Sequence, residues 1–214
     1  GLDIPIPDMK IGESIVKPCS YNQARSVIDK YEWLGTMAQR TTHTLGLFFQ
    51  DELAGVVCFA IPPTPQAAMG VAGEQYADKV KTLARGACVW WAHPHSASKL
   101  IAGAVRWMSD YTPFRLFVAY SDQRAGEIGT VYQATNWLYT GETAGDTEYF
   151  IDGDWKSGRS ARHKSYKRRG IDYRQMPSRK GNPKHRYVFI GGNKREQKKF
   201  REVLRYDVLP YPKR

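Results

Sequence analysis

Apolar and polar positions in the first part of the chain have the spacing of short strands with one helix between them. The stretch ESIVKPCSYNQARSVIDKYEWLG predicts a strand followed by a helix that is capped near Ser20 or Asn22 and ends at Gly35. Residues 43–61 hold two apolar runs joined by a polar turn, which predicts a β-hairpin. The Pro- and Gly-rich stretch 62–80 is expected to be a crossing loop.

The same alternation of strands and helices continues further along the chain. Residues 81–94 predict a strand that leads into a loop, and residues 96–111 a helix whose apolar positions share one face. The apolar run 113–120 predicts a buried strand, followed by a short helix within 121–136 and a return strand over 137–141. This order of elements predicts an α/β fold with a mixed central sheet flanked by helices.

The block YSDQRAGEIGTVYQATNWLYTG, which begins at Tyr120, is unusual for an ordinary helix. Two glycines and a threonine break its start, and polar and aromatic side chains follow. Ser121 and Asp122 stand at the carboxyl end of the predicted strand, where ligands of open α/β sheets bind. The block is therefore a candidate functional site.

Composition limits the class of protein. The 214 residues, 42% of them hydrophobic, suffice for one main domain. No apolar run reaches the roughly 18 residues of a membrane span, and no charged-then-apolar leader opens the sequence, so we expect a cytoplasmic protein. Cys19, Cys58 and Cys88 lack CxxC spacing, which favours small buried hydrophobic residues over a disulfide or metal site.

The net charge of +11 is concentrated in the last third of the chain. Residues 1–150 hold 12 Lys and Arg against 15 Asp and Glu, whereas residues 151–214 hold 20 against 6. This split predicts a nearly neutral body over 1–150 and a basic, nucleic-acid-binding extension over 151–214 that packs on the body or continues it.

The order of predicted elements resembles that of the GNAT acyltransferase fold. In that family the loop after the fourth strand, together with a helix N-terminus, wraps the pyrophosphate of acyl-CoA, a position where aligned peptide dipoles favour an anion. The corresponding loop here, HPHSASKL, has no glycine at the positions where the family pattern has them, although its small residues permit a close approach. The resemblance implies a cofactor site at Ser96, Ala97, Ser98, Lys99 and Asn136.

Several motifs further resemble the phage Mom family of DNA adenine modification proteins. They are GVAGEQYADKV, LARGACVWW, SASKLIAGAVRW, the block that begins at Tyr120, and the distal KHRYVF and LPYPK. The resemblance covers the chain from about residue 30 to its end and rests mainly on that block. It implies a GNAT-like enzyme that modifies adenine in phage DNA and so protects the phage genome from restriction.

This family resemblance also implies roles for individual side chains. Tyr132 occupies the place of a phenol that protonates a departing thiolate, and a core aromatic residue is the alternative. Asp122 orients or deprotonates the acceptor amine, or else it caps a helix. Ser98 contacts the donor phosphates or caps its own helix. Arg85 pairs with a donor or DNA phosphate, or forms a surface salt bridge.

Family members have been discussed as iron-binding through a His-Tyr pair, and here those places hold Glu32 and Trp33. An indole cannot ligate a metal. The histidines of the chain show no metal-ligand spacing apart from His93 and His95, which flank a proline and are expected to be loop residues. We therefore predict no metal site, and an acyl-CoA such as acetyl-CoA as the expected cofactor.

The basic region interleaves cations with aromatic residues, the combination that a phosphate-tracking surface with stacking partners needs. A solvated face is the alternative. The predicted partner is double-stranded DNA, and because N6 of adenine is paired and stacked in a duplex, the base must be extruded or its strand opened. Candidates for gripping the base are Trp33, Trp137 and Tyr139, and packing in the core is the commoner alternative for each of them. Candidate DNA contacts are Arg159, Arg162, His163, Lys164, Lys167, Arg168, Arg169, Lys184, His185 and Arg186.

The sequence therefore predicts an enzyme that transfers an acyl-type group, such as an acetamido or methylcarbamoyl-like group, to the exocyclic N6 amine of adenine in DNA. Two alternatives stay open. One is a GNAT acetyltransferase that acts on tRNA or on an amino-bearing hypermodified pyrimidine. The other is a non-catalytic DNA-binding protein that kept the fold and lost the donor site.

Overall fold

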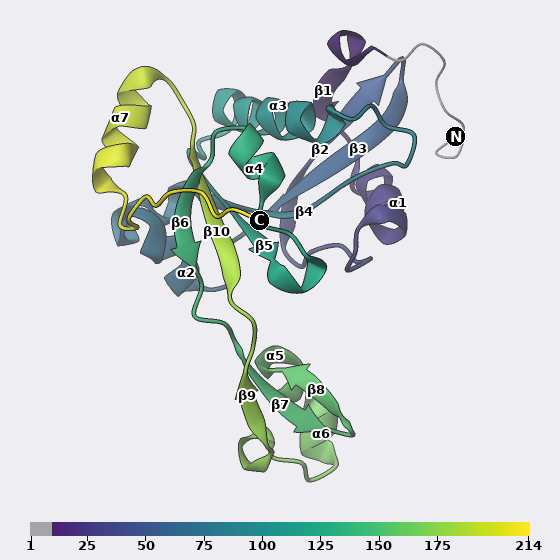
Figure 1. Ribbon diagram of the computed structural model, residues 1–214, viewed down its shortest axis with the longest axis vertical. Coiled ribbons are helices and arrows are strands. Elements are labelled where there is room, and N and C mark those ends of the chain that lie inside the picture. The colour runs from purple at the N-terminus through teal and green to yellow at the C-terminus, as the bar shows by residue number, and fades with distance from the viewer. Residues whose placement is uncertain (1–9) are drawn as a thin grey trace.

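A seven-stranded mixed sheet forms the centre of the computed structural model, which describes residues 10–214 (Figure 1). Its neighbouring strands are antiparallel except for β4 and β5, which run parallel. The predicted α/β architecture with a mixed sheet is confirmed. In spatial order the strands are β1 (Ile15–Pro18), β2 (Thr41–Phe49), β3 (Glu52–Ala60), β4 (Val80–Cys88), β5 (Leu116–Asp122), β10 (Lys184–Ile190) and β6 (Leu138–Glu142).

Helices cover both faces of this sheet, and side chains of successive strand residues point to alternate faces. Phe117 and Ala119 of β5 belong to the core beneath α3, whereas Leu116 and Val118 belong to a second core that includes Phe200 of α7. The helices are α1 (Tyr21–Tyr31), α2 (Pro65–Ala72), α3 (Ser96–Tyr111), α4 (Thr130–Ala134) and α7 (Lys194–Val203), with 3-10 turns η1 (Ile11–Glu13), η2 (Glu74–Lys79) and η3 (Gln123–Ala125). None of the helices in the described part of the chain is long and apolar enough to cross a membrane.

Local signals explain where the first helices begin. Ser20 caps α1 through a capping box with Gln23, as predicted, but the helix ends at Tyr31 rather than at Gly35. The expectation of a crossing loop over 62–80 is wrong, because this stretch contains α2 and η2. Thr64 caps α2 and a proline occupies its first turn, where the missing N–H costs no hydrogen bond.

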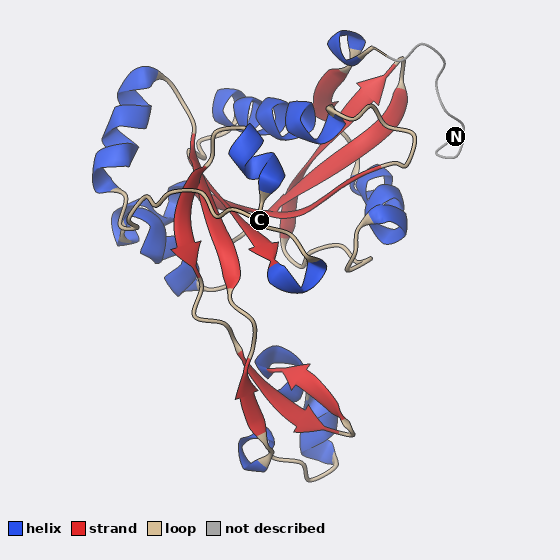
Figure 2. Cartoon of the chain, viewed as in Figure 1, coloured by secondary structure: helices blue, strands red, loops and turns tan. Residues whose placement is uncertain are grey.

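A small separate unit is inserted between β6 and β10 and projects away from the body (Figure 2). It has a three-stranded antiparallel sheet with order β8-β7-β9 and two short helices. Its elements are β7 (Thr147–Ile151), β8 (Asp154–Ser157), α5 (Gly158–Ala161), α6 (Lys164–Arg168), η4 (Tyr173–Gln175) and β9 (Ser178–Lys180).

The last third of the chain is thus divided differently from the expected body and extension. A boundary between residues 150 and 151 falls inside β7, and β10 returns to the central sheet beside β5. After α7, the chain runs back across the sheet, where Leu209 pairs with Tyr139 of β6. The basic segment therefore supplies the inserted unit, an inner strand of the body, a helix and a tail.

Candidate active site

The carboxyl ends of β4 and β5 separate from one another. The two strands pair only from Val80 opposite Leu116 to Thr82 opposite Val118. Beyond that point β4 follows β3 as far as Cys88, and β5 follows β10 as far as Asp122. Backbone groups of β4 that face this opening are left without a β5 partner, which makes them available to a ligand.

Glu127 lies within electrostatic reach of Glu32, Asp122 and Tyr132 beside this opening. We call Glu32, Asp122 and Glu127 the three-carboxylate group. Partial desolvation and the negative charges of Glu32 and Asp122 raise the pKa of Glu127 above its ordinary value. Burial, and then the charge of Glu127, raise the pKa of Tyr132 well above that of an ordinary phenol. A protonated phenol therefore stands beside a carboxylate whose basicity is increased, a pair suited to proton transfer.

Tyr132 is held by an aromatic cluster. Its ring centroid lies 5.0 Å from that of Trp137 and 5.5 Å from that of Tyr187. The Tyr187 hydroxyl donates to the carbonyl of Ile128 at 2.5 Å and accepts from Gln133 Nε2 at 3.0 Å. Tyr187 thus ties the loop before α4 to α4 itself, and this fixes the direction of the Tyr132 side chain.

The break in the helix after residue 120 has a steric reason. Gly129 precedes α4 with φ +87°, and a Cβ at this position would meet the Tyr187 ring at 2.3 Å. A side chain here would have to displace a buried strand residue and would also be strained at that φ. The predicted helix within 121–136 is therefore two pieces, η3 and α4, with Glu127 in the loop between them.

The start of α3 has the features of an anion site. Ser96, at its first turn, is 1% exposed, and within residues 10–214 its hydroxyl has no hydrogen-bond partner. His95 at the N-cap makes no side-chain capping bond, and the first turn contains no acidic residue. Because the Ser96 N–H donates to the carbonyl of His93 and its hydroxyl is buried, the first-turn N–H groups left for a phosphate are those of Ala97 and Ser98.

Two residues predicted for the cofactor site are engaged elsewhere. Lys99 Nζ donates to the carbonyls of Ile11 at 2.7 Å and Ser14 at 2.6 Å, so it anchors the N-terminal segment to α3. Asn136 lies after the last turn of α4 and lines a separate cavity between α3 and α7. Their assignment to the cofactor site is corrected, because the ammonium of Lys99 is bound to the N-terminal segment and Asn136 lies at the other cavity.

Arg85 of β4 contacts the loop that follows α1. Its guanidinium donates to the carbonyls of Thr36 and Ala84, each at 2.8 Å, and so clasps the loop that follows α1. Glu32 ends the same helix and its carboxylate accepts from the backbone of Leu34. Arg85 therefore fixes the segment that brings Glu32 to the three-carboxylate group.

Two of the three proposed base-gripping aromatic residues are in the core. Trp137 is fully buried, and Tyr139 is buried with its hydroxyl 2.8 Å from Nδ1 of His185. Both predictions are wrong, because the return strand places these rings under α4 and the tail. Trp33 is 51% exposed and stays a candidate.

The predicted DNA contacts fall into groups with different surroundings. His185 is buried in the central sheet and cannot reach a phosphate, and Arg186 lies over the Tyr206 ring and donates to Thr140. Lys184, at the first position of β10, is opposite Asp122 in register and so lies in the body rather than in the inserted unit.

Three of the candidates in the inserted unit already have contacts. Arg169 makes two hydrogen bonds to Asp152, and His163 caps α6. Arg159 makes a hydrogen bond to Gln39 of the body. The remaining candidates are exposed side chains of α5 and α6, and they are Arg162, Lys164, Lys167 and Arg168.

Iron does not fit the residues present. Over residues 10–214, no group of three or more His, Cys, Asp or Glu side chains is arranged to hold a metal ion. The carboxylate of Glu32 accepts from the backbone N–H groups of Leu34 and Gly35 at 2.8 and 3.1 Å, and an indole follows it. Burial raises the pKa of Cys58 to about 12, so that thiol stays protonated.

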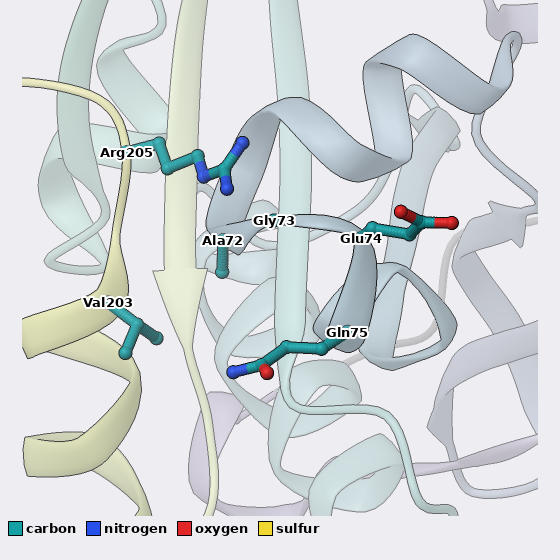
Figure 3. A pocket seen from close by; sticks show the side chains of 6 residues that line it. All are labelled: Ala72, Gly73, Glu74, Gln75, Val203 and Arg205. Atoms are coloured by element: carbon teal, nitrogen blue, oxygen red, sulfur yellow. The ribbon is translucent and has the colours of Figure 1, made fainter.

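A cavity of about 620 Å³ lies elsewhere, between η2 and the end of α7 (Figure 3). In it the Arg205 guanidinium lies over Gly73, where a Cβ would meet Nη2 at 3.0 Å. This cavity is at the amino end of β4, so it is not part of the opening between β4 and β5.

The sequence of the chain is similar to those of known proteins. The sequence model of the Mom protein family matches residues 13–213. Over 200 residues the chain is 28% identical to methylcarbamoylase Mom of Escherichia phage Mu, and the match covers 89% of this chain and 80% of that protein.

A solved structure supports the fold. The chain is similar to a spermidine N-acetyltransferase SpeG chimera from Vibrio cholerae and hSSAT, with a TM-score of 0.52 and 10% identity over 88% of this chain and 98% of the other. The predicted GNAT-like fold is confirmed. At this identity the likeness concerns the fold alone.

Proposed function

Because the chain belongs to the Mom protein family and has a GNAT-like fold, we propose that it is an enzyme that transfers an acyl-type group to N6 of adenine in phage DNA. The observation that carries the proposal is the position of Asp122, Glu127 and Tyr132 where β4 and β5 separate. The relative from phage Mu is named a methylcarbamoylase, which supports group transfer by this chain as well.

The proposed donor is an acyl-CoA thioester, which supplies an activated acyl carbon when bound. The first turn of α3 would hold its pyrophosphate through backbone N–H groups, with the hydroxyl of Ser98 beside them. Unpaired backbone groups of β4 would hold the chain that leads to the thioester, as a β-strand partner would. These contacts use the small side chains of the glycine-free loop.

Asp122 and Glu127 are the proposed bases. An exocyclic adenine amine is a poor nucleophile until a proton leaves it, and a carboxylate with a raised pKa is a stronger base than an ordinary one. With such a donor, the carboxylate would take the amine proton as the C–N bond forms and the C–S bond breaks, and the thiolate would carry the negative charge away. The Tyr132 hydroxyl, kept protonated by its burial, would donate a hydrogen bond to that sulfur.

Recognition of the acceptor is assigned to the exposed cations of α5 and α6. The inserted unit would track phosphates of the duplex, while the target base leaves the stack and enters the opening between β4 and β5. Trp33, which is exposed after the helix that ends near Glu32, would pack against the extruded base. The modified genome would resist restriction enzymes that recognise adenine.

The test is mass analysis of nucleosides from DNA of cells that express the chain, with the Tyr132→Phe variant as control. A new adenosine derivative that depends on the Tyr132 hydroxyl is expected. A modified pyrimidine, or modified nucleosides in tRNA alone, would replace the proposal with one of the alternative substrates. Unmodified nucleic acid together with retained DNA binding would instead favour a non-catalytic binding protein.

A further inference from the structure

A cleft of about 780 Å³ separates α3 from α7. We call it the α3–α7 cleft. Its walls come from the outer side of α3, the end of α4, the ends of β6 and β10, and the exposed side of α7. This volume is within the range of sites that hold a nucleotide-sized ligand. The cleft lies beyond the C-terminal end of α4, so it is distinct from the anion site at the start of α3.

Four cations line the α3–α7 cleft, namely Arg106 of α3 and Lys194, Lys198 and Arg201 of α7. The three on α7 are spaced i, i+4 and i+7 and therefore share one face of the helix. They extend over about 10.5 Å at 1.5 Å per residue. All four are exposed, and the ion pairs found within residues 10–214 involve other side chains.

The opposite face of α7 packs on the body, and this leaves the face with the three cations exposed to the cleft. Phe200 is buried against the sheet and meets the Tyr76 ring edge to face. Glu196 forms an ion pair with Arg115, with 2.7 Å between Oε2 and Nε. These contacts fix the helix in one rotation about its axis. The three cations of α7 are consequently kept on the cleft side of the helix, and no ion pair within residues 10–214 engages them.

The floor of the cleft is apolar. Leu138, Phe189 and Ile190 line it from the ends of β6 and β10, and all three are partly exposed. The side chain of Asn136 stands at the rim, held by a backbone with φ +63°. Asp110 contributes a carboxylate to the same rim. An apolar floor below a row of cations suits an unstacked base whose backbone phosphates lie above it.

We propose that the α3–α7 cleft binds a single strand of nucleic acid, with phosphates along the α7 cations and a base against the floor. A row of cations spread over about 10.5 Å is longer than a single phosphate group, so it suits successive phosphates of a strand better than one isolated anion. The inference rests on the proposed function in one respect, that the acceptor is DNA. The strand opened beside the target base is the occupant expected there.

The charge distribution supports a second nucleic-acid contact outside the inserted unit. Residues 151–183 hold 10 Lys and Arg against 3 Asp and Glu, and residues 184–214 hold the same numbers. Each segment therefore carries a net charge of +7. Residues 184–214 supply three of the four cations that line the α3–α7 cleft, Lys194, Lys198 and Arg201, so part of the basic charge of the last third lies outside the inserted unit.

The test compares two pairs of substitutions on the same helix, with a short fluorescein-labelled oligothymidylate as the probe in anisotropy titrations at several salt concentrations. Lys194→Gln with Lys198→Gln removes two cations of the cleft. Arg195→Gln with Lys199→Gln removes two cations at the same spacing that do not line it. The first pair should lower the slope of log affinity against log salt by about 1.4, and the control pair should leave it unchanged. An equal fall in both pairs would overturn the proposal in favour of a general basic field.

A second variant fills the cleft and keeps every charge. Ala102 is an exposed residue of α3 on the cleft wall, so Ala102→Trp should weaken oligothymidylate binding at least fivefold at an unchanged melting temperature. Undiminished binding by this variant would contradict a site in the cleft. If free adenosine monophosphate at matched phosphate concentration displaces the probe, the proposed single strand would be wrong and the cleft would be a site for a small nucleotide.

These binding experiments do not depend on modification activity. If the cleft variants behave as expected and DNA from expressing cells is unmodified, the cleft inference stands and the proposed function fails. If DNA is modified and the cleft variants bind the probe like the parent chain, the reverse holds.

Discussion

The central sheet and the inserted unit are stabilised in different ways. Both faces of the sheet carry continuous clusters of buried apolar side chains, whereas Ile151 and Ala161 are the fully buried apolar residues within the inserted unit. The unit relies instead on surface contacts such as Arg179 over the Trp155 ring at 4.2 Å. Small sheets with little buried area are marginally stable alone. The proposed chemistry is thus on the part of the molecule with an extensive core, and the proposed DNA contact is on a part with little core.

The place of the insertion explains why the sheet tolerates it. β6 and β10 are antiparallel neighbours, so the inserted unit is an enlarged hairpin connection. Long surface connections cost a fold little, because loop-closure entropy grows slowly with length. The chemistry and the exposed cations can therefore be separated by substitution, and the following predictions are arranged around that separation.

The largest expected effect is on the chemistry in the sheet. Tyr132→Phe keeps the ring between Trp137 and Tyr187 and deletes the hydroxyl, so modification should fall by about 10²- to 10⁴-fold while the fold persists. Asp122→Asn should act similarly if the carboxylate takes the amine proton. The measurements are modified adenine per DNA and thermal stability on the same preparation. Full modification by both variants would exclude these residues from the reaction.

The next effect concerns duplex binding by the inserted unit. Lys167→Gln with Arg168→Gln should lower the slope of log affinity against log salt by about 1.8, because each lost phosphate contact removes about 0.9. Arg174→Gln with Arg179→Gln is the matched control in the same unit, since these cations contact Tyr173 and Trp155. Filter binding or anisotropy with a duplex gives both slopes. A slope unchanged in the first pair would make α6 a solvated face.

A smaller effect is expected from the donor. Coenzyme A at about 100 times its dissociation constant should stabilise the chain by about 2.7 kcal/mol, which raises the melting temperature of a domain this long by about 5–10 °C. Ser98→Trp should abolish that shift by blocking the first turn of α3, whereas Ser98→Ala should keep most of it. An unchanged melting temperature at saturating coenzyme A and acetyl-CoA would point to a different donor.

The smallest effect is a pH dependence at Glu127. The raised pKa means that folding disfavours its ionised form, so its stabilising contribution is full below the ordinary value of 4.5 and is lost as pH rises through the folded-state value. Glu127→Gln should therefore melt higher than the parent at pH 8, by about 1–2 °C, and the two should converge below pH 4. Glu13→Gln, at an exposed carboxylate, controls for the lost charge. A lower melting temperature for Glu127→Gln at pH 8 would contradict the three-carboxylate group.

The sequence by itself determined the elements whose signals are local. The apolar stripe of α3, the hairpin of β2 and β3, and the Ser20 cap of α1 are set by the spacing of a few neighbouring residues. The importance of the block after Tyr120 could also be recognised, because two glycines before a helix are costly unless the backbone needs them. Within that block, family resemblance implied chemical roles for Asp122 and Tyr132.

Only the tertiary structure decided which distant residues meet. Glu127 joins Asp122 and Glu32 because the ends of α1 and β5 lie at the same edge of the sheet, and no spacing along the chain encodes that. Trp137 and Tyr139 could not be placed in the core from their local pattern, because the tail and α4 cover them.

The charge of the last third shows the same limit. Counting residues assigns a basic segment, but β10 enters the sheet between β5 and β6, and this buries His185 and separates the exposed cations into two places. Strand pairing between segments far apart in the chain is chosen by total burial and hydrogen bonding, which no local window contains. The sequence therefore determined the amount of basic charge and its order along the chain, and the sheet decided which of those charges face the solvent.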